Sequence, residues 1–161
     1  MQPNIIEISR HTVPVRDESD VYAAVGLGRK MTTEMGFGPG AQACAQTIIA
    51  ELARNALRHG GGGTVGLRAL KQETRRGLEI VVQDRGPGIS DVSRALDGGG
   101  ACPAVLSGAP SRGSGLGVGL SSAQRLADEF TIDSVVGSGT RIRALKWDNY
   151  PAGKRPSRRN K

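Results

Sequence analysis

Hydrophobic residues alternate with polar ones in several short stretches of the chain, and a period of two residues predicts β-strands. The first such stretch lies around Ile6 and Ile8, close to the start of the chain. Two later stretches stand on either side of a turn at residues 71–77, which is typical of a β-hairpin. Beyond the first, the predicted strands cover these residues: 65–69, 78–82, 131–136 and 140–147.

Segments between these strands have the spacing of amphipathic helices. Helices are expected over residues 18–35 and about 40–58, with a short one near 91–97. A further helix is predicted from an apolar stripe with helical spacing: Leu116, Leu120, Ala123, Ala127 and Phe130. Because the strands come in hairpins and the helices cluster, we expect an α+β fold in which helices cover one face of a sheet.

The chain has 161 residues, which suits one domain with a short tail. Lys and Arg number 22 against 15 Asp and Glu, for a net charge of +7, and the last residues are rich in the basic type. We therefore expect a nearly neutral domain over residues 1–150 and a disordered basic tail over residues 151–161. The tail is either a solvated segment or a weak contact for an acidic partner or nucleic acid.

Several classes of protein are excluded by composition. No apolar run is long enough to span a membrane, and the first ten residues do not have the pattern of a signal peptide. Cys44 and Cys102 are too few for a disulfide framework or a zinc site, so a reduced, cytoplasmic setting is expected. Aromatic residues make up only 3% of the chain, which argues against a stacking surface for nucleic acid.

The second predicted helix places polar residues on a face that should pack on the sheet. Cys44, Ile48, Glu51 and Asn55 follow one another at helical spacing and form one stripe. Either this end of the helix is exposed and both polar side chains are solvated, or they line a site. In a site, the carboxylate of Glu51 can accept a proton and the amide oxygen of Asn55 can hold a hard metal ion.

Two glycine-rich segments suggest further parts of a site. Asp84 ends an apolar strand and is followed by Gly86 and Gly88, an arrangement that suits either a tight turn or the close approach of a flat ligand. A carboxylate at such a strand end can accept a hydrogen bond from an exocyclic amine of a base. The segment 113–120 opens a helix and is either an anion site or a flexible linker, and residues 98–112 suggest a mobile lid.

In this order, the motifs resemble the N, G1, G2 and G3 boxes of the GHKL (Bergerat-fold) ATPases, which include gyrase, Hsp90, histidine kinases and anti-sigma kinases. The resemblance covers about residues 5–147 and implies a two-layer sandwich with a mixed, mostly antiparallel sheet. The matching segments are Glu51-Leu52-Ala53-Arg54-Asn55, Asp84-Arg85-Gly86-Pro87-Gly88, Gly115-Leu116-Gly117-Val118-Gly119 and Gly139-Thr140.

Within that superfamily the chain is most similar to the RsbT-type serine kinases of bacterial stress-signalling complexes. The stretches that carry this similarity include Glu34-Met35-Gly36-Phe37-Gly38, Arg125-Leu126-Ala127-Asp128-Glu129-Phe130 and Ala144-Leu145-Lys146-Trp147. One departure is the segment 98–114, which is longer and more apolar than the corresponding lid of such kinases. The basic tail is also not required by the family's motifs.

The resemblance assigns roles in binding Mg²⁺ and ATP. It implies that Asn55 coordinates Mg²⁺, that Glu51 is the general base, and that Asp84 binds the adenine amine. Gly86 and Gly88 would leave room for the base, and Thr140 would lie near the adenine. The phosphates would be wrapped by the third box, that is, by Gly115, Leu116, Gly117, Val118 and Gly119, with Arg112 in reach of the γ-phosphate.

A function follows from the same resemblance. The expected reaction transfers the γ-phosphoryl group of ATP to a serine or threonine of a STAS-domain antagonist protein, in a partner-switching (stressosome-type) module that also activates a PP2C-type phosphatase by binding. No membrane and no specific nucleic acid are expected as partners. An anti-sigma kinase that sequesters a sigma factor, and a non-catalytic ATP-gated interaction module, remain alternatives. His59 lies either at the pocket rim or on the plain surface, and Trp147 is expected in core or edge packing.

Overall fold

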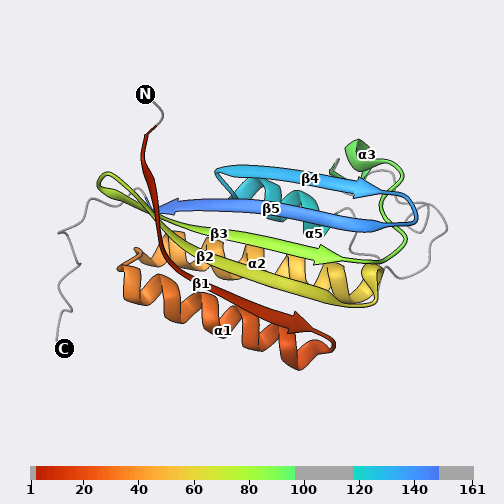
Figure 1. Cartoon of the computed structure of the whole chain (residues 1–161), viewed down its shortest axis with the longest axis horizontal. Helices are drawn as coiled ribbons and strands as arrows, with labels where there is room; N and C mark the ends of the chain where they lie inside the picture. Colours follow the sequence, from red (N-terminus) through yellow and green to blue (C-terminus); the bar gives the residue numbers. More distant parts are fainter. Residues whose placement is uncertain (1–2, 97–117, 149–161) are drawn as a thin grey trace.

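The computed structural model describes residues 3–96 and 118–148, which form a single sheet with helices against it (Figure 1). The five strands have the order β1-β2-β3-β5-β4, and each neighbouring pair is antiparallel. The described elements are β1 (Ile5–Val15), α1 (Glu18–Met35), α2 (Pro39–Gly60), β2 (Gly63–Gln72), β3 (Arg75–Asp84), α3 (Val92–Leu96), α5 (Val118–Leu126), β4 (Glu129–Val135) and β5 (Gly139–Asp148).

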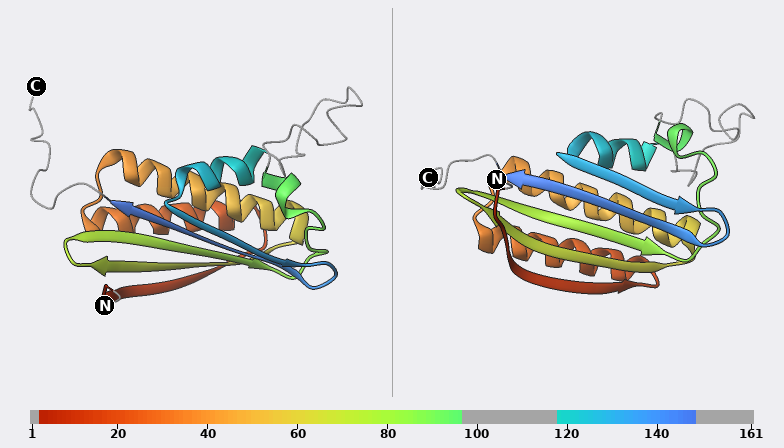
Figure 2. Two further views of the ribbon diagram at one scale, coloured as in Figure 1. Left: turned by 90° about the horizontal axis from the view of Figure 1, so that it is seen from above. Right: turned by 45° about the horizontal axis from the view of Figure 1, so that its top comes forward.

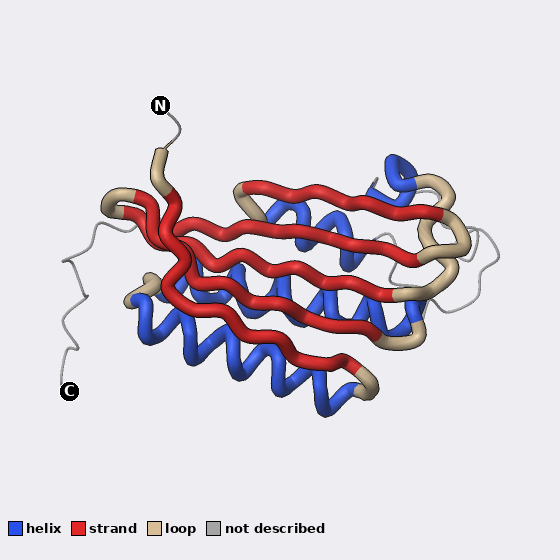
Figure 3. The backbone as a smooth tube through the Cα atoms, viewed as in Figure 1, coloured by secondary structure: helices blue, strands red, loops and turns tan. Residues whose placement is uncertain are grey.

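Helices α1, α2 and α5 lie on one face of the sheet, as the turned views in Figure 2 show, so the predicted two-layer α+β class is confirmed. The tube in Figure 3 shows the strands running side by side across the other layer. The resemblance also allowed a mixed sheet. Every pairing among the described strands is antiparallel, so that part of the expectation is not met there.

Most elements lie where the sequence pattern predicts them. The helix expected over residues 18–35 has those bounds, and the helix expected near 91–97 is found as α3. The hairpin turn is shorter than predicted, because β2 and β3 already pair from Gln72 and Arg75 onwards. The predicted tail, the segment 98–114 with Cys102 and Arg112, and Leu116 lie outside the described residues.

One helix boundary is wrong in the prediction. Phe130, which was expected on the stripe of the last helix, lies in β4 opposite Ala144, and α5 ends at Leu126. The cause is a hydrogen bond of 2.9 Å from the backbone N–H of Asp128 to the carbonyl of Leu145. This bond joins the chain to the sheet two residues before Phe130. Phe130 therefore lies in a strand, although its spacing from the preceding apolar residues is helical.

The first strand is longer than expected and is only partly covered. β1 extends to Val15, which is buried, whereas Ile6 and Ile8 are each 54% exposed. Their alternation therefore marks the strand correctly without marking a buried face. The register with β2 shifts between Glu7 and Ser9, which is a bulge in this edge strand.

Local signals fix the ends of the two long helices. The side chain of Asp17 caps α1 by accepting from the N–H of Asp20 at 3.0 Å, and Gly36 ends the helix at a φ of 76°. Pro39 opens α2 at the first helical position. The two helices pack closely at Gly28, where any Cβ would collide with Ile49. This contact brings α1 and α2 side by side.

The core lies between the helices and the sheet. Helix α2 provides its central, fully buried face with Ile48, Ile49 and Leu52. Burial of such side chains stabilises the fold by about 1.5–3 kcal/mol each. The strand residues that meet this face are Val65, Leu67, Leu78, Ile80, Ile142 and Ala144.

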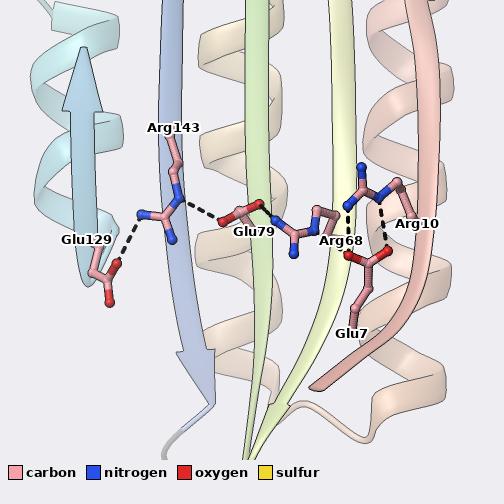
Figure 4. A network of polar contacts seen from close by, with 6 residues as sticks. All are labelled: Glu7, Arg10, Arg68, Glu79, Glu129 and Arg143. Atoms are coloured by element: carbon pink, nitrogen blue, oxygen red, sulfur yellow. Dashed lines mark hydrogen bonds and ion pairs between the residues drawn. The ribbon is translucent and has the colours of Figure 1, made fainter. Parts of the chain in front are cut away.

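Charged side chains cross the opposite face of the sheet in an alternating row (Figure 4). At its centre Glu79 is 4% exposed and accepts from Arg68 and Arg143, each at 2.7 Å. The row continues to Glu129 at one end and to Glu7 and Arg10 at the other: Arg143–Glu129, Arg68–Glu7 and Arg10–Glu7. The pKa of Glu7 is lowered to about 2, mainly by its hydrogen bond with Arg10.

Trp147 packs on the same outer face. It is 4% exposed and clusters with Leu70 and Leu145, and its ring lies so close to Gly77 that a Cβ there would be 2.7 Å from it. The guanidinium of Arg75 lies 4.2 Å from the ring centroid, within the range of a cation–π contact. The expectation of a packing role for Trp147 is confirmed.

Candidate functional site

An open pocket lies beside the C-terminal half of α2. All but one of its described lining residues belong to this helix, where they recur at helical spacing on one side. The other one, Gly119, belongs to α5, which packs next to α2. The lining residues are Glu51, Arg54, Asn55, Arg58, His59 and Gly119.

Glu51 and Asn55 lie one helical turn apart in this pocket. Asn55 is 9% exposed and Glu51 is half-buried, so the alternative of a fully solvated helix end does not hold. A Cβ placed on Gly119 would lie 2.7 Å from Oε2 of Glu51, which shows how closely the start of α5 approaches this carboxylate. Of the predicted phosphate loop, Gly119 is thus brought to the pocket, and Val118 begins the same helix. Gly115, Leu116 and Gly117 lie outside the described residues.

Asp84 ends β3 beside the last residues of α2. It is 8% exposed, and its Oδ1 accepts from the N–H of Gly86 at 2.9 Å. A Cβ on Gly60 would lie 2.8 Å from this Oδ1, so Gly60 leaves the room that the carboxylate occupies. Gly60 directly follows His59, which lines the pocket. The contact between Gly60 and Asp84 therefore places Asp84 beside the end of α2 that carries His59. Among the described residues, no hydrogen bond to the other oxygen of Asp84 is found.

The glycines after Asp84 allow chain segments to pack. A Cβ on Gly86 would lie 3.0 Å from the carbonyl oxygen of His59, and Gly88 adopts a φ of 77° against Val135. The side chain of Asp84 accepts from the N–H of Gly86 and so forms an Asx turn at the start of this segment. The expected space for a flat ligand at these glycines stays a prediction.

Thr140 lies directly opposite Asp84 in the β3–β5 pairing and is 5% exposed. Its hydroxyl is 2.9 Å from that of Ser134, which also accepts from the N–H of Ile89 at 2.7 Å. Sequence reasoning missed Ser134, because nothing local distinguishes it from other strand serines. These bonds tie the G3-like residue Thr140 to the chain that follows Gly88.

The electrostatics of the pocket are mixed. Burial lowers the pKa of His59, with help from the charge of Arg58, while the negative charge of Asp84 acts in the opposite direction. Of the two alternatives for His59, the structure has the pocket rim, because His59 lines the pocket. Arg54 and Arg58 were not singled out from the sequence. Both could have been found from the sequence, because they follow Glu51 by three and seven residues and so lie on the same side of the helix.

Oxygen donors in the pocket suit a hard metal ion that is shared with a ligand. The side-chain oxygens of Asn55 and Glu51 are of the type that Mg²⁺ prefers. The described residues contain no group of three or more His, Cys, Asp or Glu side chains arranged to hold a metal by themselves. That donor set matches the usual Mg²⁺ site, in which one or two protein oxygens combine with waters and substrate phosphates.

The architecture and pocket define the class of protein, and comparison with known proteins supports it. The family model for histidine kinase-, DNA gyrase B- and HSP90-like ATPases matches residues 40–150. The chain belongs to this family, and the pocket is therefore expected to serve ATP. The matched residues include all four segments that resemble the N, G1, G2 and G3 boxes.

Within the family the chain is an RsbT-like serine/threonine-protein kinase. It is 40% identical over 135 residues to the serine/threonine-protein kinase RsbT of Bacillus subtilis (strain 168). The aligned residues cover 84% of this chain and 94% of that protein. A solved structure with the same fold is that of the SiaB–SiaC complex from Pseudomonas aeruginosa. The likeness there has a TM-score of 0.59 at 15% identity and covers 86% of this chain and 89% of that one.

Among the described residues, no helix has both the length and the apolar character needed to cross a membrane.

Proposed function

We propose that this protein transfers the γ-phosphoryl group of ATP to a serine or threonine hydroxyl of a STAS-domain protein. The observation that carries the proposal is the pairing of Glu51 and Asn55, one turn apart in a single pocket, in a chain of RsbT-like sequence. A carboxylate for the acceptor proton and an amide oxygen for a metal ion are the groups that such a transfer needs.

The nucleotide binds between the end of β3 and helices α2 and α5. Asp84 accepts a hydrogen bond from the adenine amine, and Thr140 lies beside it as its cross-strand partner. Gly86 and Gly88 keep the turn free of side chains. The phosphates are held by the glycine-rich segment that includes the start of α5, that is, by Gly115, Leu116, Gly117, Val118 and Gly119.

Asn55 would hold Mg²⁺ together with the phosphates of ATP. When bound, the ion would supply charge neutralisation at the phosphates, a main source of catalysis in phosphoryl transfer. The burial of Asn55 restricts the rotamers of its side chain, which favours a site that is organised before the ligand arrives.

Glu51 acts as the general base. Its carboxylate takes the proton of the acceptor hydroxyl as the new oxygen–phosphorus bond forms, and the bond from the γ-phosphorus to the bridging oxygen breaks to release ADP. Half-burial beside Gly119 limits the directions in which the Glu51 side chain can turn. Catalysis then rests on positioning and charge neutralisation.

The partners follow from the RsbT-like character of the chain. Phosphorylation adds about −1.5 to −2 charges to the acceptor at neutral pH, enough to weaken its contact with the kinase. The released kinase then binds and activates a PP2C-type phosphatase, so that one protein exchanges two partners. This cycle would take place in the cytoplasm, as expected for a chain with two cysteines.

The test uses purified protein, radiolabelled ATP with Mg²⁺, and a panel of single-domain STAS proteins from the same genome. Label should appear on a STAS serine or threonine with the wild-type chain, and Glu51→Gln and Asn55→Ala should each reduce it by at least about a hundredfold. A matched control is Glu34→Gln, because Glu34 lies exposed on α1. Undiminished transfer by either pocket variant would overturn the assigned roles, and ATP binding without any transfer would favour the non-catalytic module.

A further inference from the structure

An ion pair joins helices α1 and α2 beside the pocket. Nε of Arg54 lies 2.9 Å from Oε1 of Glu18, and the two side chains are 27% and 50% exposed. Arg54 lines the pocket, whereas Glu18 is not among the described lining residues. The pair therefore connects a pocket residue with a residue outside the pocket on another helix.

Helix geometry separates Arg54 from the proposed nucleotide side. At about 100° per residue, Arg54 and Asn55 project to opposite sides of Glu51. Asn55 is buried, while Arg54 reaches Glu18 at the start of α1. A group held by Arg54 would thus approach Glu51 from the side of α1, away from Asn55.

The guanidinium of Arg54 has donors to spare. Its Nε is engaged by Glu18, and among the described residues no hydrogen bond from Nη1 or Nη2 is found. Both of those nitrogens carry N–H donors in a fixed planar fork. The hydrogen bond with Glu18 raises the pKa of Arg54, and the nearby charge of Glu51 contributes in the same direction. Arg54 is therefore a fully charged, tethered donor next to the proposed base.

We propose that Arg54 is a positioning residue for the protein acceptor: held by Glu18, it binds oxygen atoms of the acceptor chain next to the hydroxyl that Glu51 deprotonates. This inference rests on the proposed function, because it names a contact of the same phosphoryl transfer. Glu18 acts only through Arg54, by limiting the rotamers of a long side chain before the acceptor binds.

The test measures initial rates of transfer to a labelled STAS acceptor over a range of acceptor concentrations, together with ATP affinity by calorimetry. Arg54→Ala should raise the KM for the acceptor by about tenfold, the equivalent of one lost charged hydrogen bond, with kcat and ATP affinity changed less than about twofold. Glu18→Gln should raise the same KM by a smaller factor. In the double variant, Glu18→Gln should add nothing to the effect of Arg54→Ala, because its only route is through Arg54.

Arg16→Gln is a matched control, since Arg16 pairs with Asp20 near the same helix end but does not line the pocket. Lost ATP affinity in Arg54→Ala would overturn the inference by making Arg54 a nucleotide ligand. Independent effects of the two substitutions, or an unchanged KM in both, would also overturn it. Absence of transfer by the wild-type chain to any STAS protein would instead overturn the proposed function itself.

Discussion

Asp84 at the end of β3 and Thr140 at the start of β5 are direct cross-strand partners, and both are buried. They lie far apart in the sequence, in segments that resemble two different boxes of the family. The antiparallel register of the sheet therefore sets the distance between the two sides of the proposed adenine site.

Asp84→Asn should change the choice of base. An amide that keeps its oxygen toward the N–H of Gly86 presents an NH₂ group where the carboxylate would accept from the adenine amine. We expect the variant to bind ATP about tenfold or more weakly, and to bind inosine triphosphate, which has an oxygen in place of that amine, better than ATP. Calorimetry with both nucleotides measures this, and Asp133→Asn on the exposed part of β4 is the control. An unchanged preference for ATP would show that Asp84 does not contact the base.

Two glycines in helices should respond to alanine in opposite ways. A Cβ on Gly60 would collide with the side chain of Asp84, so Gly60→Ala should cost about 1–3 kcal/mol of stability and weaken ATP binding. Gly26 in α1 has open space around it, so Gly26→Ala should stabilise the protein by up to about 1 kcal/mol. Urea unfolding measures both, and a loss of stability in Gly26→Ala would contradict the packing described for α1.

The contribution to stability of the charged row on the sheet face opposite the helices should depend mainly on Glu79 at its centre. Glu79→Gln removes the carboxylate that Arg68 and Arg143 share at a position that is 4% exposed, and it leaves each arginine only its outer partner. It should lower the free energy of unfolding by about 2 kcal/mol. Glu129 at the rim has a side chain 51% exposed, so Glu129→Gln should change stability by less than about 1 kcal/mol. Equal effects of the two substitutions in urea unfolding would be inconsistent with this account.

His59 should make stability depend on pH in the mildly acidic range. Its pKa in the folded protein is lowered from 6.5, chiefly by burial, so the unfolded chain takes up the proton first as the pH falls. The free energy of unfolding should therefore decrease below about pH 6.5, since the unfolded state binds more protons there. Urea unfolding at several pH values between 7.5 and 5.5 measures the slope, and His59→Gln should reduce it. An identical slope in the variant would assign the effect to other groups.

Local sequence signals were sufficient to predict most of the helices and strands, because the start and end of such elements depend mainly on neighbouring residues in the chain. The capping residue Asp17 and the glycine at 36 bound α1 where the pattern predicted it. The same local reasoning failed at Phe130, where one long-range hydrogen bond from Asp128 to Leu145 replaced helix by strand. Helical spacing alone cannot show that bond, because its acceptor belongs to a strand that follows later in the chain.

What the sequence by itself determined is the order of elements, the α+β class, and the placement of Glu51 and Asn55 on one side of a helix, since all of these follow from periodicity. Only the tertiary structure decided that Asn55 is buried while Arg54 is held by Glu18 from another helix, and that Asp84 meets Thr140 across two strands. These contacts join residues distant in the chain. Their partners are set by the packing of helices and the register of strands, which no local pattern specifies.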